Sequence, residues 1–141
     1  MLDNLATLLL DDTDDLTGAE RYARQGYAAW KALRGEGDDP DVAISGGILG
    51  TIAFRKGDRK EARRLLQEAL RIHEAVAGPD NPNVAATLNL LAGLEAADRH
   101  PDVARAQLNR SLEISRKLNL DPRHYLVVQA QNGLKALGSR K

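Results

Sequence analysis

An internal repeat with a period of 42 residues restricts the fold of this chain more than any other feature. The segment from Asp39 to Ser45 aligns with the segment from Asn81 to Thr87, position by position. The same shift brings apolar residues onto apolar residues downstream: Leu49 onto Leu91, Leu66 onto Leu108 and Ile72 onto Ile114. A period between 20 and 50 residues is typical of arrays in which one small structural unit is stacked repeatedly.

Each copy of the repeat is predicted to be a pair of helices. Val42, Leu49 and Ile52 form one apolar stripe at helical spacing, and a second stripe follows at Ala62, Leu65, Leu66, Ala69, Leu70 and Ile72. Gly50 and Ala92 are expected to face Ala62 and Ala104 and to let the two helices of a copy approach closely. The fold class predicted from these patterns is all-α.

Three helix starts carry the same signal. Pro40, Pro82 and Pro122 suit the first turn of a helix, and each follows an aspartate or asparagine that can act as an N-cap. We therefore predict three copies, at about 2–34, 39–77 and 81–119, and a C-terminal capping helix at about 121–138. Residues 1–141 then form one domain, because a single helix pair cannot bury its own apolar faces. The capping helix is expected to turn five residues toward the stack: Tyr125, Leu126, Val128, Leu134 and Leu137.

Composition argues against an enzyme and against several classes of partner. Lysine plus arginine equals aspartate plus glutamate, at twenty each, so the whole chain has no net field for nucleic acid or anionic lipid. Cysteine is absent, and the three histidines are scattered, which leaves no metal-binding set. No phosphate-binding loop and no activated nucleophile is present. We therefore predict no catalytic residues, no cofactor and no metal.

The sequence also argues against a membrane protein. No stretch approaches the roughly 20 apolar residues of a membrane span, and the apolar N-terminus has no basic segment of the kind found in secretory signals. We expect a cytoplasmic protein. A dense basic cluster around the middle second helix is interpreted as a solvated face, since only Phe54 stands near it as an aromatic that could stack on a base.

At the level of its motifs the chain resembles the tetratricopeptide repeat family, and more narrowly the 42-residue variety found in kinesin light chains. The resemblance rests on Gly78 to Ala92, where a Gly-Pro entry is followed by Asn-Pro-Asn-Val-Ala and then Leu-Asn-Leu-Leu-Ala, and on Gly57 to Ala75. It covers about residues 2–120. It implies a right-handed α-solenoid whose first helices line a concave groove that receives a peptide or a partner's surface.

The resemblance also implies which residues line that groove. Carried over position by position, the concave-face residues are Asp3, Asn4, Thr7, Asp11, Gly47, Thr51, Arg55, Asn89, Gly93 and Ala97. The family's paired asparagines survive here only as Asn4 and Asn89. An asparagine side chain supplies both a donor and an acceptor, as an extended peptide requires.

The function expected from the sequence is that of a protein-interaction module that binds a protein or peptide in the groove. Two alternatives stay open. The chain is a scaffold that forms homodimers through its N-terminal repeat, or it is a regulatory repeat segment of a larger signalling protein. A size measurement at several concentrations distinguishes the homodimer from the groove binder.

Overall fold

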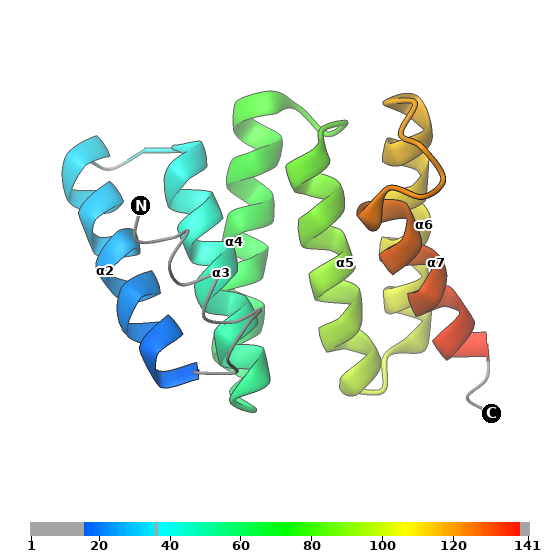
Figure 1. The fold of residues 1–141 in the computed structure, drawn as a ribbon, viewed down its shortest axis with the longest axis horizontal. Coiled ribbons are helices and arrows are strands. Elements are labelled where there is room, and N and C mark those ends of the chain that lie inside the picture. The colour runs from blue at the N-terminus through cyan, green and yellow to red at the C-terminus, as the bar shows by residue number, and fades with distance from the viewer. Residues whose placement is uncertain (1–15, 36, 139–141) are drawn as a thin grey trace. The chain divides into compact units, whose positions relative to one another are not determined.

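The computed structural model describes residues 16–35 and 37–138, and these residues form six helices and no strand (Figure 1). The helices are α2 (Leu16–Arg34), α3 (Pro40–Arg55), α4 (Arg59–Ala77), α5 (Pro82–Ala97), α6 (Pro101–Lys117) and α7 (Tyr125–Gly138). The prediction of an all-helical repeat fold is confirmed. The 42-residue period reappears in the helix bounds, because α5 begins and ends 42 residues after α3.

Both predicted proline starts in the middle of the chain are confirmed. Asp39 is the N-cap of α3, where its side chain accepts a hydrogen bond from the backbone N–H of Asp41 at 2.9 Å. Asn81 caps α5 and accepts from the N–H groups of Asn83 and Val84, at 3.0 and 3.1 Å. These contacts satisfy donors that the first turn of a helix leaves without a partner.

The ends of α3, α5 and α6 share one backbone geometry. Gly57, Arg99 and Asn119 follow these helices with positive φ angles of 87°, 63° and 55°. In each case the next residue donates its N–H back to a carbonyl five residues earlier, as from His100 to Glu95 at 2.8 Å. This is the Schellman motif, which glycine adopts without strain and asparagine tolerates. Arg99 is the one of the three whose side chain is unsuited to that φ.

The chain divides into two compact units, residues 1–72 and 73–141, which we describe separately. In the first unit α2, α3 and α4 run alternately up and down (Figure 1). Ala19 and Ala23 of α2 pack with Leu49 and Ile52 of α3 and Leu65 of α4, all buried. Gly50 of α3 packs closely on α4, but the nearest atoms belong to Leu66 and Leu65, not to Ala62 as expected.

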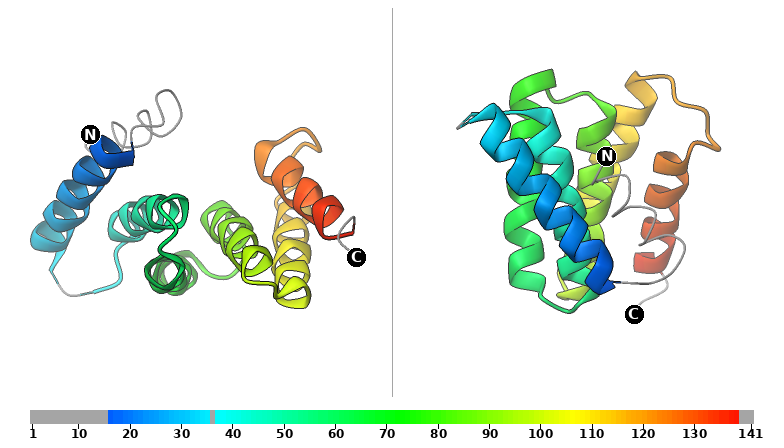
Figure 2. Two further views of the ribbon diagram at one scale, coloured as in Figure 1. Left: turned by 90° about the horizontal axis from the view of Figure 1, so that it is seen from below. Right: turned by 60° about the vertical axis from the view of Figure 1, so that its left-hand side comes forward.

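The second unit contains α5, α6 and α7, and α7 lies against both of the others (Figures 1 and 2). Its core joins five buried residues from the three helices: Ala92, Ala104, Leu108, Ala130 and Leu137. Gly133 of α7 makes the close approach, because a Cβ there would lie 2.9 Å from Leu108 Cδ1.

The capping helix differs from the prediction in its start and in its buried face. It begins at Tyr125, not at about 121, because Asp121 holds the N–H and side chain of Arg123 in a turn and His124 Nδ1 accepts from the N–H of Leu126. Leu126 and Leu137 are buried as predicted, and Leu134 is half-buried. Tyr125 and Val128 are instead exposed, at 62% and 39%, and Val127 and Ala130 take their place in the core.

Candidate binding surfaces

The ten residues predicted to line a groove fall into three groups. Asp3, Asn4, Thr7 and Asp11 lie outside the described residues. Gly47, Thr51 and Arg55 lie on α3 in the first unit, and Asn89, Gly93 and Ala97 lie on α5 in the second. Successive members of each of these two groups are four residues apart, so each group occupies one side of its helix.

On α3 the predicted face offers little free hydrogen-bonding capacity. The Thr51 hydroxyl donates to the carbonyl of Gly47 at 3.0 Å, within the same helix. Gly47 leaves open space, since a Cβ added there would meet no atom of the described residues within 4 Å. Ile44, three residues before Gly47 on the same side of the helix, is 41% exposed. Apart from the exposed Arg55, this face of α3 therefore consists of small and apolar side chains.

On α5 the side chain of Asn89 already forms hydrogen bonds within the second unit. The Asn89 amide donates to the backbone carbonyl of Leu126 at 3.0 Å and to Gln129 Oε1 at 3.4 Å, which ties α5 to α7. Its own oxygen is buried and has no hydrogen-bond partner among the residues that the structure describes. Leu90 is 37% exposed, and a Cβ added at the exposed Gly93 would meet nothing within 4 Å in the described part of the chain.

Sequence reasoning missed Ile44 and Leu90 as surface residues. Both are large aliphatic residues, which are usually assigned to the core. The signal that could have identified them is their register, because they lie three residues before Gly47 and Gly93, on the predicted groove face and off the buried stripe.

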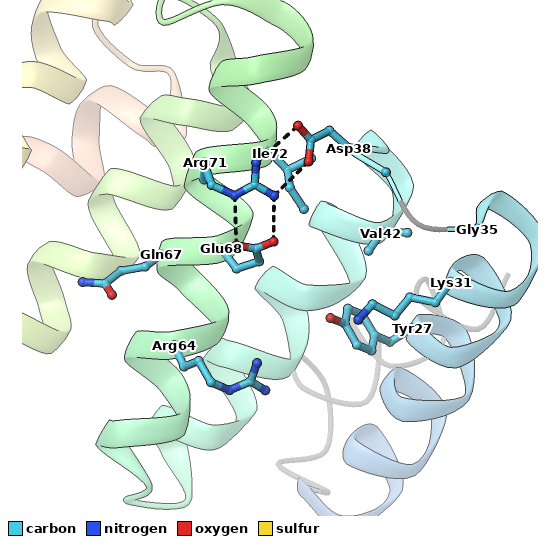
Figure 3. A pocket seen from close by; sticks show the side chains of 11 residues that line it. Tyr27, Lys31, Gly35, Asp38, Val42, Arg64, Gln67, Glu68, Arg71 and Ile72 are labelled. Atoms are coloured by element: carbon cyan, nitrogen blue, oxygen red, sulfur yellow. Dashed lines mark hydrogen bonds and ion pairs between the residues drawn. The ribbon is translucent and has the colours of Figure 1, made fainter.

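A second candidate site lies in the first unit, in an open cleft of about 860 Å³ between α2 and α4 (Figure 3). Its apolar part consists of the Tyr27 ring, Val42 and Ile72. Around these stand charged and polar side chains of α2, of α4 and of the loop before α3: Lys31, Asp38, Arg64, Gln67, Glu68 and Arg71. No pattern in the sequence predicted this cleft.

Arg71 organises the charges at one end of the cleft. Its guanidinium donates to both oxygens of Glu68, at 3.0 and 2.8 Å, and to both oxygens of Asp38, at 3.2 and 2.8 Å. These hydrogen bonds lower the pKa of the Asp38 and Glu68 carboxyls and raise the pKa of Arg71. The guanidinium is thus shared by two carboxylates, and its charge is already used within the unit.

Tyr27, Lys31 and Arg64 form the other end of the cleft. The Lys31 ammonium lies 4.9 Å from the centroid of the Tyr27 ring, in a cation–π contact. The Arg64 guanidinium and the Tyr27 hydroxyl point toward each other across the cleft (Figure 3). Arg64 donates to both oxygens of Glu61, at 2.9 and 2.7 Å, and this pairing raises the pKa of Arg64.

The basic cluster near α4 is largely paired in the structure. Besides Arg64 and Arg71, Lys56 donates to Glu20 Oε2 on α2 at 2.5 Å. Arg24 shares Glu20, and these contacts lower the pKa of that carboxyl. Among the described residues no group of three or more histidine, aspartate or glutamate side chains is arranged to hold a metal ion. None of the described helices is both long enough and apolar enough to cross a bilayer.

Comparison with known proteins agrees with the repeat architecture. A search of curated protein sequences finds no match to this chain. Among solved structures, the chain is similar to BtubC (BKLC) from P. vanneervenii, with a TM-score of 0.80 and 22% sequence identity over 96% of the present chain. The match covers 53% of BtubC, so the present chain spans about half of that protein's length.

The family assignment follows from a model of the family itself. The tetratricopeptide repeat model matches residues 41–117, which is more than half of the chain. The matched segment contains α3, α4, α5 and α6, the two helix pairs that are related by the 42-residue period. The chain belongs to the tetratricopeptide repeat family.

Proposed function

We propose that this chain is a protein-interaction module whose contact surfaces are the exposed faces of α3 and α5. Tetratricopeptide repeats are generally protein–protein interaction modules and not enzymes. The observation that supports these faces is the exposure of Ile44 and Leu90, at 41% and 37%, beside the open glycines Gly47 and Gly93. Exposed aliphatic side chains beside glycines suit the close approach of another polypeptide.

Recognition on these faces depends mainly on apolar contact. The Thr51 hydroxyl is used within α3 and the Asn89 amide is used to hold α7, so neither is available to clamp an extended peptide backbone. Fully burying an aliphatic side chain contributes about 1.5–3 kcal/mol. Covering the exposed portions of Ile44 and Leu90 therefore contributes about 1–2 kcal/mol in total, or roughly tenfold in affinity.

The test compares a double variant on these faces with a matched control. Ile44→Ser with Leu90→Ser removes the apolar surface, and Val103→Ser removes a similarly exposed residue, at 48%, from α6. After equal thermal unfolding has been verified, a partner captured by wild type from lysate is purified and its Kd is measured for all three proteins. We expect a Kd about tenfold higher for the double variant and unchanged for Val103→Ser. Equal Kd values for all three would contradict the proposal.

The homodimer alternative is tested in the same preparation. Light scattering over a range of protein concentrations measures whether the chain associates with itself. If wild type dimerises, no other polypeptide is captured and Ile44→Ser with Leu90→Ser leaves the dimer intact, the scaffold interpretation replaces the groove interpretation. The N-terminal repeat, to which that alternative assigns the contact, lies partly in residues 1–15, outside the described residues.

A further inference from the structure

The start of α7 differs chemically from the starts of α3 and α5. An aspartate or asparagine caps those two helices, whereas the residue before α7 is His124. The carbonyl of His124 accepts from the N–H of Val128 at 3.0 Å, and its Nδ1 accepts from the N–H of Leu126 at 3.2 Å. His124 therefore holds the first turn of α7 as an N-cap does, with a ring nitrogen in place of an oxygen.

This cap requires a neutral ring. An imidazole nitrogen accepts a hydrogen bond only when it has no proton, and in the imidazolium both ring nitrogens are donors. A histidine changes its charge between about pH 5 and 8. Protonation of His124 removes the acceptor of the Leu126 N–H and places a positive charge at the N-terminus of α7, which the helix dipole disfavours. The aspartate and asparagine caps of α3 and α5 keep their acceptor oxygens in the same range.

The carboxylate that interacts with His124 lies outside α7. It belongs to Asp121, in the turn before the helix, and it attracts a positive charge on the ring. Hydrogen bonds from the side chain and the N–H of Arg123 lower the pKa of the Asp121 carboxyl, so this group stays ionised in mild acid. A protonated His124 therefore has an acceptor in Asp121 and no longer accepts from α7.

The charges on the helices around α7 are already paired. Both α5 and α6 pack against α7. Glu95 is the one charged residue of α5, and it binds His100. The charged residues of α6 pair as Asp102 with Arg105, Arg110 with Glu74, Glu113 with Arg116 and Lys117 with Asp80. The charged residue of α7 itself, Lys135, lies in the last turn of the helix.

The cap and the contact between α5 and α7 meet at one residue. Leu126 donates its N–H to His124, and its carbonyl accepts from the Asn89 amide at 3.0 Å. Leu126 is fully buried, so loosening of the first turn of α7 moves a residue of the core. Asn89 then loses this acceptor, and its Oδ1 has no partner among the described residues. Both the donor and the acceptor of this amide become available beside the α5 face.

We propose that His124 is a pH-sensitive cap that controls access to Asn89. At neutral pH it holds the first turn of α7 on α5. In mild acid the protonated ring turns to Asp121, the turn loosens, and Asn89 is released toward a ligand of the α5 face. Loss of an N-cap shifts such an equilibrium about fivefold. The inference adds regulation to the α5 face, so its use in binding rests on the proposed function.

Two substitutions at the cap bracket the expected behaviour. His124→Ser supplies an N-cap that does not titrate, and His124→Ala supplies no cap at any pH. Hydrogen exchange of the full chain is measured by NMR at pH 7.5 and pH 5.0 for wild type and both variants, and each rate is compared with that of an unstructured peptide at the same pH. The readouts are the backbone amides of Leu126 and Val128 and the side-chain amide of Asn89, with the backbone amide of Leu91 in α5 as the reference for global stability.

Wild type should match His124→Ser at pH 7.5 and His124→Ala at pH 5.0. The protection of Leu126, Val128 and the Asn89 amide should therefore fall about fivefold in wild type on acidification, and by less than about twofold in either variant. The proposal is overturned if wild type matches one variant at both pH values, if His124→Ser loses as much protection as wild type, or if Leu126 responds and Asn89 does not. It is also overturned if Leu91 loses protection by the same factor, because acid then acts on the whole unit. No partner is present in this measurement, so its outcome is independent of the Kd comparison that tests the proposed function.

Discussion

Replacing Gly50 by alanine should destabilise the protein relative to the same replacement at Gly47. Both glycines lie inside α3, so both substitutions gain about 1 kcal/mol of helix propensity. They differ in what the added Cβ meets. At Gly50 it would lie 2.8 Å from Leu66 Cγ, 3.1 Å from Leu66 Cδ2 and 3.4 Å from Leu65 Cβ. At Gly47 it would meet none of the described residues within 4 Å.

The size of the difference follows from how little room the neighbours have to move. Leu66 is 1% exposed and Leu65 is 5% exposed, and the closest atom is the branch point of the Leu66 side chain. Forcing an extra carbon into such a core costs about 1–3 kcal/mol. Gly47→Ala should therefore stabilise the protein by about 0.5–1 kcal/mol, and Gly50→Ala should lie about 1–3 kcal/mol below it.

Urea unfolding of the two single variants and of wild type measures this difference directly. The slope m should stay the same for all three proteins, because the surface exposed on unfolding is nearly unchanged. Helix propensity cancels between the variants, so the difference in their free energies of unfolding reports the contacts with Leu66 and Leu65. If Gly50→Ala were as stable as Gly47→Ala, the close approach of α3 and α4 at Gly50 would be refuted.

Three further changes test caps and titration. Arg99→Gly should stabilise by about 1 kcal/mol in urea unfolding, because Arg99 adopts a φ of 63° that glycine accepts freely. Asn81→Ala should lower the free energy of unfolding by about 1–2 kcal/mol, since two N–H donors of α5 lose their acceptor. His73 is 5% exposed, and burial lowers its pKa below the usual 6.5. The contribution of neutral His73 to the free energy of unfolding should be complete above pH 6.5. It should be lost as the pH falls from 6.5 through the lowered pKa, because the unfolded chain binds a proton at a higher pH than the folded chain does. The measurement is the urea midpoint of unfolding of wild type and of His73→Leu at a series of pH values. If the two midpoints fell equally with decreasing pH, the prediction would be contradicted.

The repeat fold was predictable because its signals are local and occur at a fixed period. The predicted starts of α3 and α5 at their prolines are correct. In both helices a buried valine, Val42 or Val84, follows two residues after the proline. At Pro122 the first buried residue is Leu126, four residues later. The two extra residues form a turn before α7, so this helix starts later although its Asp-Pro signal is the same as that at Asp39. The difference in spacing is visible in the sequence and could have corrected the predicted start.

The binding surfaces were less predictable because they depend on which polar groups are already used. Thr51 and Asn89 have the right chemistry for a ligand, but a carbonyl of the same helix and the backbone of α7 occupy their donors. Neither contact follows from the repeat alignment. The first is a local hydrogen bond that any helical threonine can form, and the second depends on where α7 docks.

The pairing of charges on the second helices changes from one copy of the repeat to the next. At one pair of second-helix positions the chain has glutamate and arginine, and Glu74 binds Arg110. At the preceding pair it has Lys31 and Glu68, and here Glu68 and Asp38 both accept from Arg71 while Lys31 lies over the Tyr27 ring. The two pairs look equivalent in an alignment, since each has one charge of either sign. The two pairs differ in a third residue, Arg71, which lies three residues after Glu68. The equivalent residue in the next copy is Glu113. Glu113 binds Arg116, so Arg110 remains paired with Glu74. One additional arginine in a copy thus changes which internal charges pair, while the helical repeat stays the same.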